Sequence, residues 1–368
     1  MIRPILALAA LCLHAAARAT VQEPDAAFPS AAVNAVIESA AFEGDVVISD
    51  SLDAPDEFPP RYRWVGLLPE PGRGWPDGLT WRWASVTKQI VAILVMREVE
   101  AGRIDLDLPV ATYLPAVASA NAGTATVRNL LQHRAGLPNP DAADEPGVPA
   151  FYRSDFAGSR DPVTGFCAGP VTGAPGGDWA YNNCDYMVLG AVLEAVTGLP
   201  WDKLFMRDIA GPLGFEFAGA YPGEQFTRWG VINGAREPEI DLSAYGAAGG
   251  LYGEPDDIIA IDNALMRGEL LGSAALAEMW RGDPALGYMA LGQWVFEVPL
   301  KGCDAPVKIV ERRGDIGAVQ VRNFILPGKR LAVVAFSQEK PFDFGEVWQG
   351  SGFAHDLLAA AACPQGKP

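Results

Sequence analysis

A serine and a lysine lie three residues apart in Ser85-Val86-Thr87-Lys88, where an apolar helical pattern begins. Side chains at this spacing share one face of a helix, with their Cβ atoms about 5–6 Å apart. A serine hydroxyl becomes a good nucleophile when a neighbouring base takes its proton. Burial can make lysine that base, because desolvation disfavours the ammonium form. The segment therefore predicts Ser85 as a nucleophile and Lys88 as its activator. The ordinary alternative is a capping serine beside a solvated lysine.

A second group of polar residues, Tyr181-Asn182-Asn183, stands just ahead of another helical pattern. A phenol near a lysine can relay a proton during catalysis. The amide of Asn183 can donate to a substrate carbonyl and also bind the lysine. We therefore expect Tyr181 to be catalytic and Asn183 to bind substrate. The alternative is a tyrosine in a turn, with Asn183 capping the helix.

A third group, Arg312-Arg313-Gly314, is predicted at the end of a strand, with Asp315 opening the turn that follows. A cation on an edge strand can hold a substrate carboxylate or carbonyl, and the glycine allows close backbone approach. A backbone N–H just past the glycine could pair with that of Ser85 in an oxyanion hole. We therefore expect Arg312, Gly314 and Asp315 to bind substrate. The alternative is two solvated arginines at a hairpin.

The chain contains few of the residues and motifs that other catalytic chemistries require. It has three histidines, His14, His133 and His355, and no G-x-S-x-G elbow. It has no H-E-x-x-H and no paired C-x-x-C, so we expect no metal. Phosphate loops and dinucleotide fingerprints are absent as well, so we expect no cofactor. An enzyme that uses His133 or His355 with another serine remains a rival interpretation.

The charge and composition of the chain restrict its partners. The formal net charge of −17 argues against nucleic acid and anionic membranes, which both require basic patches. Hydrophobic residues make up 49% and charged residues 20%, a balance that favours a well-buried globular core. We therefore expect a small-molecule or peptide substrate. The sequence leaves the oligomeric state open.

The N-terminus has the pattern of an export signal over residues 1–19. Arg3 precedes an apolar run, and Ala17-Arg18-Ala19 is a small-x-small cleavage site. No second apolar stretch reaches spanning length, so stable membrane insertion is not expected. We therefore predict a periplasmic or secreted protein.

Four cysteines follow this signal: Cys167, Cys184, Cys303 and Cys363. In an oxidising compartment an even number permits two disulfides, with three possible pairings. Proximity in the sequence favours Cys167 with Cys184 and, by elimination, Cys303 with Cys363. The alternative is four buried free thiols.

Periodicity and turn residues predict the secondary structure. Helices are expected over residues 31–42, 85–101, 127–133, 185–197, 258–266 and 348–362, and strands over residues 45–51, 62–68, 79–83, 288–296, 307–312, 319–326 and 331–337. Residues 139–178 are rich in Gly, Pro and Asp, and a loop this long is usually functional or partly disordered.

This order of elements predicts a mixed α/β fold of the α+β type. Strands from both ends of the chain can form one antiparallel-dominated sheet flanked by helices. We expect residues 20–104 and 244–368 to form this sheet lobe and residues 105–243 to form a mainly helical lobe with long loops. A pocket is expected in the cleft between the lobes.

In order and spacing, the three groups resemble the motifs of the penicillin-recognising serine hydrolases. The chain is similar to the class C β-lactamase-like branch, which includes D-aminopeptidases and family VIII esterases. The resemblance covers about residues 31–362. Further matching segments are Leu130-Leu131-Gln132-His133-Arg134-Ala135-Gly136-Leu137, Pro175-Gly176, Pro212-Leu213-Gly214-Phe215 and Ala248-Gly249-Gly250-Leu251.

The resemblance implies a β-lactamase/transpeptidase-like fold and a role for each residue. Ser85 would be acylated, Lys88 would accept its proton, and Tyr181 would serve as the second acid and base. Asn183 would orient the substrate. The backbone N–H groups of Ser85 and Asp315 would stabilise the oxyanion.

The third motif departs from the family pattern. Arg312 replaces the usual lysine or histidine, and Arg313 replaces the hydroxyl usual in true β-lactamases, which argues against efficient β-lactamase activity. Two guanidiniums could favour an anionic substrate, or could be paired with Glu311 and Asp315. We predict an exported serine hydrolase acting on an ester or amide, with D-amino-acid peptides among the candidates. The alternative is a non-catalytic or weakly active ligand-binding protein on the same scaffold.

Overall fold

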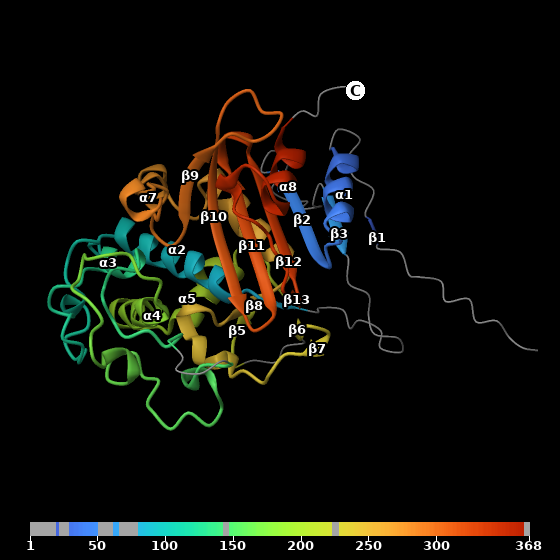
Figure 1. Ribbon diagram of the computed structural model, residues 1–368. Helices are drawn as coiled ribbons and strands as arrows, with labels where there is room; N and C mark the ends of the chain where they lie inside the picture. Colours follow the sequence, from blue (N-terminus) through green and yellow to red (C-terminus); the bar gives the residue numbers. More distant parts are fainter. Residues whose placement is uncertain are drawn as a thin grey trace, which may run out of the picture.

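The computed structural model describes residues 20–21, 29–50, 62–65, 80–142, 147–222 and 228–363 (Figure 1). The export signal predicted over residues 1–19 lies outside this part of the chain. No helix of the described residues is long and apolar enough to cross a bilayer.

One antiparallel sheet dominates the structure, and its strands come from the two ends of the chain. Its seven strands are, in spatial order, β1 (Thr20–Val21), β3 (Tyr62–Val65), β2 (Gly44–Asp50), β12 (Leu331–Ser337), β11 (Val319–Leu326), β10 (Val307–Ile316) and β9 (Trp294–Val298). The fold class predicted from the sequence is confirmed.

The central strands are apolar on both faces because helices cover both sides of the sheet. Along β12, Val333 and Ala335 face one hydrophobic core, whereas Val334 and Phe336 face the other. This alternation follows from the two-residue period of a strand. Helices α1 (Ser30–Ser39) and α8 (Phe353–Ala362) cover the first face (Figure 1).

The second face carries the larger core and most of the helices. Helices α2 (Thr87–Glu100) and α6 (Pro255–Arg267) pack on this face of the sheet. The remaining helices lie around α2 in Figure 1 and are α3 (Val127–Leu131), α4 (Asn183–Thr197), α5 (Trp201–Phe205) and α7 (Ser273–Met279). The second core therefore joins the sheet to the helical part of the molecule.

Two small sheets complete the fold. The first joins β4 (Trp81–Arg82), β8 (Leu251–Gly253) and β5 (Gly219–Ala220). The second joins β13 (Glu339–Lys340), β6 (Val231–Ile232) and β7 (Ala235–Arg236). The first sheet matters for function, because β4 leads directly into the segment that carries Ser85 and Lys88.

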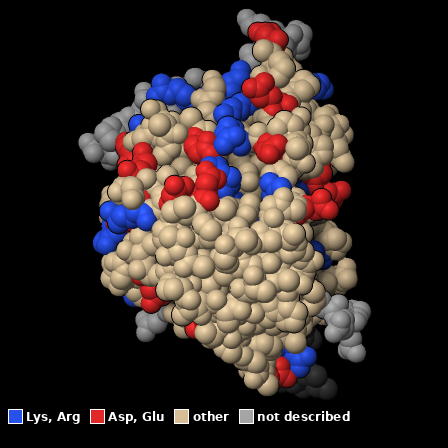
Figure 2. Space-filling view, turned by 90° about the vertical axis from the view of Figure 1, so that its left-hand side faces the viewer, with Lys and Arg blue, Asp and Glu red and all other residues tan. Residues whose placement is uncertain are grey.

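Charged side chains are unevenly distributed over the surface. On the face shown in Figure 2 they gather in the upper part, and the broad lower part carries few. Residues 108–127 and 162–177 contain no Asp, Glu, Lys or Arg. Helix α3, which follows the first stretch, lies toward this side in Figure 1.

Several element boundaries differ from the sequence predictions. Strand β9 begins at Trp294 and not at residue 288, because Tyr288 and Gly292 adopt positive φ in the preceding turn. Strand β10 continues to Ile316, so the turn predicted at Asp315 is wrong; the turn is made by Gly317 and Ala318.

Two differences concern helices. Positive φ angles at Gly350 and Gly352 separate the short turn Val347–Gln349 from α8, so the last predicted helix starts at Phe353. Helices α5 and α7 were not predicted. With five and seven residues, they are too short to show a clear helical period.

Both disulfides that proximity in the sequence favours are present in the structure. Cys167 is bonded to Cys184 and Cys303 to Cys363. The second bond ties the end of α8 to the segment after β9. It therefore fastens a covering helix to the main sheet.

Removing the Cys303–Cys363 bond is expected to lower the free energy of unfolding. The bond closes a loop of 60 residues, and a loop of this size corresponds to about 4 kcal/mol of chain entropy. The double variant Cys303→Ser/Cys363→Ser should show this loss in denaturant titrations. A difference below about 1 kcal/mol from the oxidised parent would contradict the prediction.

Candidate active site

Ser85 stands at a tight junction between β4 and α2. A 3-10 turn over Ala84–Val86 connects the two elements, and Ala84 has a φ of 47°. A positive φ is costly for a residue with a side chain, and such strain is often found at functional sites. The N–H of Trp83 donates to Leu251 O at 2.9 Å, which anchors the junction to β8. Ser85 is thereby held half-buried at the start of the helix.

Lys88 is fully buried and lies one turn after Ser85. Its Nζ is 3.0 Å from Ser85 Oγ, 2.6 Å from Asn183 Oδ1 and 2.7 Å from the carbonyl oxygen of Ala248. An amide oxygen and a backbone carbonyl can only accept hydrogen bonds. A neutral amine has two N–H groups, which these two oxygens use. Its lone pair is then left for the hydroxyl of Ser85.

The surroundings of Lys88 favour this neutral form. Burial lowers the pKa of Lys88 well below its ordinary value, and the nearby Arg312 lowers it further, against opposing effects of Asp141 and Asp185. Asp185 is itself buried, which raises its pKa well above the ordinary value. The raised pKa disfavours the charged form of Asp185 and so weakens it as a counter-ion for an ammonium group.

Tyr181 completes the group around Ser85. Its Oη lies 2.6 Å from Ser85 Oγ, and Arg312 Nη2 donates to the same Oη at 3.1 Å. Burial raises the pKa of Tyr181, while the charge of Arg312 and the hydrogen bond to Ser85 lower it. Burial is the largest of these effects, so Tyr181 holds its proton at rest. Arg312 is placed to stabilise the phenolate if that proton leaves.

Arg312 is buried and bonded to the protein. Its Nε donates to Ser85 O at 2.8 Å, and its Nη1 has no hydrogen-bond partner among the described residues. The pairing of β10 with β9 ends at Glu311 and Trp294, so among the described residues β10 has no strand partner on this side from Arg312 onward. This local edge is what brings the guanidinium of Arg312 beside Ser85 and Tyr181.

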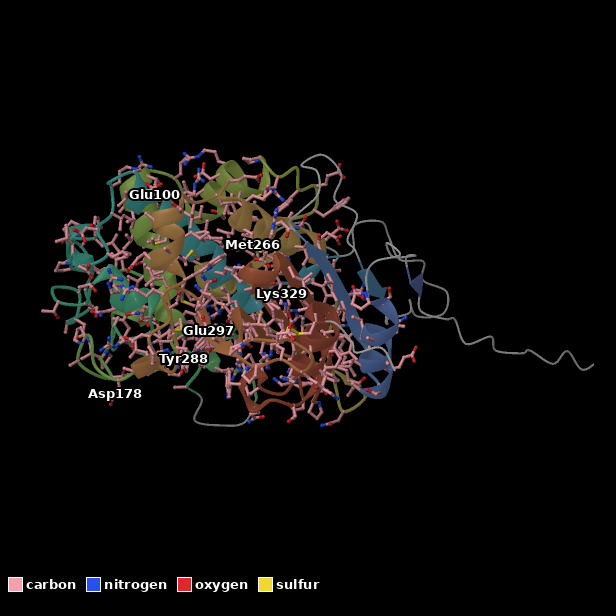
Figure 3. All side chains as sticks on the ribbon, turned by 90° about the horizontal axis from the view of Figure 1, so that it is seen from above. Glu100, Asp178, Met266, Tyr288, Glu297 and Lys329 are labelled. Atoms are coloured by element: carbon pink, nitrogen blue, oxygen red, sulfur yellow. A yellow bond between two sulfur atoms is a disulfide. The ribbon has the colours of Figure 1, made fainter. Side chains whose placement is uncertain are left out.

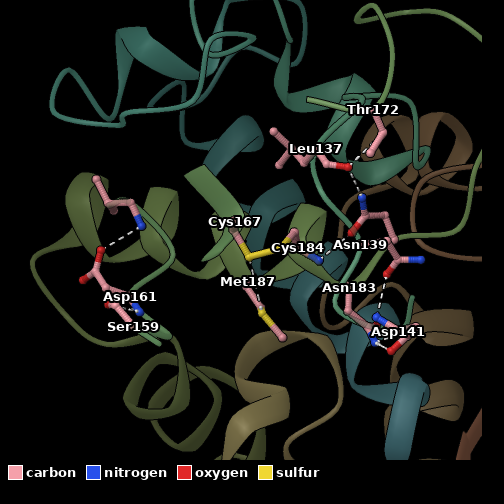
Figure 4. Close-up of a disulfide and its surroundings, with 12 residues drawn as sticks. Leu137, Asn139, Asp141, Ser159, Asp161, Cys167, Thr172, Asn183, Cys184 and Met187 are labelled. Carbon is pink, nitrogen blue, oxygen red and sulfur yellow. Dashed lines mark hydrogen bonds between the residues drawn. A yellow bond between two sulfur atoms is a disulfide. The ribbon is translucent and has the colours of Figure 1, made fainter. Parts of the chain in front are cut away.

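Asn183 is presented by the first turn of α4. The N-cap is Asn182, whose Oδ1 accepts from Cys184 N at 2.8 Å, so the alternative of Asn183 as the cap is wrong. The Asn183 side chain is thus free to bridge Lys88 to Asp141. Its Nδ2 lies 2.9 and 3.0 Å from the two carboxylate oxygens of Asp141, as Figure 4 shows.

Gly314 allows β10 to approach the start of α2. A Cβ at this position would lie 2.8 Å from Ser85 N and 2.9 Å from the Cβ of Ala84. Any side chain would therefore push the strand away from Ser85. The glycine keeps the backbone of β10 against the N–H of Ser85, the arrangement that an oxyanion hole needs.

Arg313 and Asp315 point into ion pairs of their own. Arg313 pairs with Glu311 at 2.8 Å and with Glu346 at 2.7 Å. Asp315 pairs with Lys340 at 2.7 Å, so the considered pairing of Arg313 with Asp315 does not occur. The side-chain charges of Arg313 and Asp315 are thus both paired within the protein. For Asp315, this leaves the backbone as the group that can contact a substrate.

An open pocket of about 460 Å³ lies on the side of Arg313 and Trp294. It is lined by three indoles and by Arg313, Ala285, Leu286 and Gly287. The indoles belong to Trp179, Trp294 and Trp348. Trp294 connects the cavity to Ser85, because its ring centroid is 5.3 Å from Arg312 Cζ. The pocket can therefore hold an apolar or aromatic group against Trp294, whose ring also contacts Arg312.

The two described histidines do not contact a serine. His133 Nδ1 accepts from Asn182 N at 3.2 Å, and its ring lies 4.6 Å from that of Tyr181. His355 Nδ1 is 3.0 Å from Asp356 Oδ1 on α8. Within the described residues, neither histidine is placed to activate a serine, and no cluster of His, Cys, Asp and Glu could hold a metal ion.

The sequence did not indicate Asp141, Tyr152 or the indole cavity as parts of the site. Asp141 lies in the loop between α3 and α4, where no local pattern marks its position. Ala248 contributes a backbone oxygen, which any residue type could supply. Its position in the Ala248-Gly249-Gly250-Leu251 segment is therefore the one feature of the sequence that could have indicated its role. The three indoles come from distant segments that meet only in the fold.

A family model described as Beta-lactamase matches residues 61–349. Among curated proteins, esterase EstB of Burkholderia gladioli is 30% identical over 305 residues, 71% of this chain and 76% of that protein. The D-alanyl-D-alanine-carboxypeptidase/endopeptidase AmpH of Escherichia coli is 27% identical over 183 residues, 48% of this chain and 46% of that protein. The match thus spans about three quarters of the first relative and about half of the second.

Solved structures show the same fold. A D-stereospecific amidohydrolase from Streptomyces sp. has a TM-score of 0.66 and 23% identity, covering 90% of this chain and 98% of that chain. The D-amino acid amidase from Ochrobactrum anthropi SV3, complexed with L-phenylalanine amide, has a TM-score of 0.71 and 20% identity, with the same coverage.

Proposed function

The chain belongs to the beta-lactamase family, and from this membership we propose that it cleaves esters or amides through a covalent acyl-enzyme on Ser85. The observation that carries the proposal is the set of contacts of Lys88. Both of its N–H groups meet obligatory acceptors, and its lone pair faces Ser85 Oγ at 3.0 Å. Such a pair is an activated nucleophile.

Acylation would use the hydrogen-bond chain as a proton relay. Ser85 Oγ transfers its proton to Lys88 Nζ and attacks the substrate carbonyl carbon. The bond to the leaving group breaks, and Tyr181 Oη gives this group its proton. Arg312, 3.1 Å from that oxygen, stabilises the resulting phenolate. The N–H groups of Ser85 and Asp315 hold the oxyanion between β10 and α2.

Deacylation would run through the same groups. The phenolate of Tyr181 takes a proton from water, and the hydroxide attacks the acyl carbonyl. The bond to Ser85 Oγ breaks, and the ammonium of Lys88 returns its proton to this oxygen. Every proton is then back in its starting place. In this scheme Arg312 acts on Tyr181 and not on a substrate carboxylate.

The cavity indicates what kind of leaving group would fit. Its lining residue Trp294 contacts Arg312, and Arg312 holds the oxygen that protonates the leaving group. The pocket would therefore receive the leaving-group side of the substrate. Aromatic rings stack favourably on indoles. Arg313 is already paired with two carboxylates, which gives no support to recognition of an anionic substrate. An aryl ester or an aryl amide is the best match.

Export is the cellular setting that we propose. Two disulfides are typical of proteins that fold in an oxidising compartment. This feature supports a periplasmic or secreted enzyme, as the N-terminal pattern predicts.

Covalent labelling tests the proposal directly. A fluorophosphonate probe should modify the native protein once, and mass spectrometry of the digest should place the probe on the peptide containing Ser85. The Ser85→Ala variant serves as the control and should remain unlabelled. Labelling of a different serine, or ligand binding without any labelling, would favour the rival interpretation of a histidine-dependent or non-catalytic protein.

A further inference from the structure

Arg82 and Glu237 form a buried ion pair that the proposed mechanism does not use. The Arg82 side chain is 3% exposed and the Glu237 side chain 1%. Taking two charges out of water is costly, and replacing such a pair by apolar residues is often neutral or stabilising. A buried ion pair is therefore weak evidence for a role in stability alone. Its contacts indicate a second role.

Arg82 lies in β4, three residues before Ser85 in the chain, and its guanidinium donates to three groups. Nη1 donates to Ile316 O at 3.3 Å, at the end of β10. Nη2 donates to Glu237 Oε1 and, at 3.2 Å, to Arg228 O. A guanidinium can make these bonds together because its N–H groups are fixed in a planar fork. Arg82 thus ties the strand that leads to the nucleophile to the end of β10.

Glu237 directly follows β7 and holds the turn that joins β10 to β11. Its Oε2 accepts from Ala318 N at 2.7 Å, and its Oε1 accepts from Gly230 N at 2.9 Å as well as from Arg82. A Cβ at Gly317 would overlap Oε2, so the turn packs directly on the carboxylate. Glu237 therefore fixes the end of β10 from the side opposite to β4.

The end of β10 carries one of the two proposed oxyanion donors. The N–H groups of Ser85 and Asp315 come from different elements, so their separation depends on what joins β10 to the junction before α2. Arg312 makes one connection, through its Nε to Ser85 O at 2.8 Å. Arg82 makes a second connection at Ile316. Asp315 lies in the chain between these two points, which restrict the movement of its N–H relative to that of Ser85.

We propose that the Arg82–Glu237 pair positions the two N–H groups of the oxyanion hole. This inference rests on the proposed acyl transfer through Ser85 and adds two positioning residues to it. Preorganised donors stabilise the negative charge that develops on the carbonyl oxygen in the transition state. Such a site must be held to within about 0.5 Å of the productive geometry. The pair acts through the backbone and does not touch the substrate.

The main test replaces Arg82 by lysine and measures acylation by a phenyl ester in stopped flow. Lysine keeps a positive charge for Glu237 but lacks the fork that also reaches Ile316 O. Loss of a whole oxyanion donor costs about 10²- to 10³-fold, so a displaced donor should slow acylation about tenfold to a hundredfold. The dissociation constant of the ester before acylation should stay unchanged, because the hole acts on the transition state. An unchanged acylation rate, or a loss explained by weaker ester binding, would overturn the inference.

Glu237→Gln disturbs the same contact from the other side. Glutamine has one side-chain oxygen, and its NH₂ group would face an N–H donor, so it cannot accept from both Arg82 and Ala318 N. This variant should also acylate more slowly than the unmodified protein. The double variant Arg82→Lys/Glu237→Gln should be no slower than the slower single variant, because the two residues act as one unit. Losses that simply add would show that the two residues do not act as a pair.

Glu100→Gln is the matched control for Glu237→Gln. Glu100 Oε1 also accepts from a backbone N–H, that of Gly272 at 2.9 Å. Glu100 is the last residue of α2, at the opposite end from Ser85, and Figure 3 places it at the edge of the molecule. Its replacement should leave the acylation rate unchanged. A loss equal to that of Glu237→Gln would overturn the inference, since any carboxylate that holds the backbone would then have the same effect.

The acyl-enzyme gives a spectroscopic readout of the oxyanion hole. Hydrogen bonds from the two N–H groups polarise the ester carbonyl and lower its stretching frequency. Tyr181→Phe should accumulate the acyl-enzyme, so infrared spectra of this variant with an isotope-labelled acetyl group report the band. Adding Arg82→Lys should move the band to higher frequency. An unmoved band would overturn the inference, because a loss of stability elsewhere in the fold does not change these hydrogen bonds.

Amide hydrogen exchange keeps this inference distinguishable from acyl transfer itself. Exchange in the turn between β10 and β11, above all at Ala318, should be faster in Arg82→Lys and in Glu237→Gln than in the unmodified protein. Equal exchange would overturn the inference even if esters are hydrolysed. Absence of all hydrolysis by the unmodified protein, together with faster exchange in both variants, would refute acyl transfer and leave the fixing of β10 by the pair supported.

Discussion

Replacing Lys88 by methionine is expected to slow acylation of Ser85 about 10⁴-fold, at the upper end of what a general base contributes. Methionine has a similar length and no ionisable group, so it fits the buried position but cannot take the proton of Ser85. The hydrogen bonds to Asn183 and Ala248 are lost as well, which adds a loss of positioning. Stopped-flow release of phenol from a phenyl ester measures this step.

The pH dependence gives a second readout of the same base. Lys88 must be neutral to act, so kcat/KM should rise with pH through the pKa of Lys88 and fall as the pH drops and the amine is protonated. Because burial lowers this pKa, the rise should come well below the pH at which an exposed lysine titrates. Tyr181 has a raised pKa and should keep its proton over this range.

Lys203→Met provides the matched control for Lys88. The Lys203 side chain is 66% exposed and pairs with its neighbour Asp202, so its loss should leave the acylation rate unchanged. A Lys88→Met protein that folds, shows an unaltered circular dichroism spectrum and still acylates rapidly would rule out Lys88 as the base.

Replacing Tyr181 by phenylalanine is expected to lower kcat about 10²- to 10³-fold for amides. The change removes one oxygen, the atom that lies 2.6 Å from Ser85 Oγ and receives the hydrogen bond of Arg312. An amine needs a proton to leave, whereas a phenolate leaves readily without one. Acylation by a phenyl ester should therefore suffer less, and slow deacylation should let the acyl-enzyme accumulate.

Burst kinetics with a phenyl ester measure this accumulation. The Tyr181→Phe variant should release one equivalent of phenol per chain and then turn over slowly. Tyr113→Phe is a suitable control, because among the described residues the Tyr113 hydroxyl bonds only to the backbone of Asp105 and to none of the site residues. Equal losses for amides and phenyl esters would show that Tyr181 does not act as the acid.

The central motifs could be predicted from the sequence because the residues of each motif lie close together in the chain. Ser85 and Lys88 meet because they are three residues apart at the start of a helix. Strands β11 and β12 were predicted with their observed boundaries, since an apolar run bounded by turn residues defines them. The resemblance to the family and the fold class are confirmed by the comparisons.

The remaining parts of the site depend on contacts between distant segments. Asp141 reaches Asn183 across 42 positions of the chain, and no periodicity links the two. Whether Arg313 is paired or free to bind a substrate could not be decided from the sequence, because its partner Glu346 lies 33 residues away. The boundary of β9 was missed because residues 288–293 are apolar enough for a strand, while their turn depends on backbone angles. The division into two lobes stays a prediction.

The Cys167–Cys184 bond makes the chemistry of this protein depend on how it is produced. Cys184 directly follows Asn183, and its partner Cys167 belongs to the long loop segment before Tyr181 (Figure 4). The covalent link thus fixes the turn of α4 that presents an amide to the catalytic amine. A preparation made in a reducing cytoplasm would contain molecules without this link, in which the turn is held less firmly. Free thiols should therefore be titrated in each preparation whose rate is measured. A low specific activity could otherwise reflect an incompletely formed disulfide and not a poor substrate.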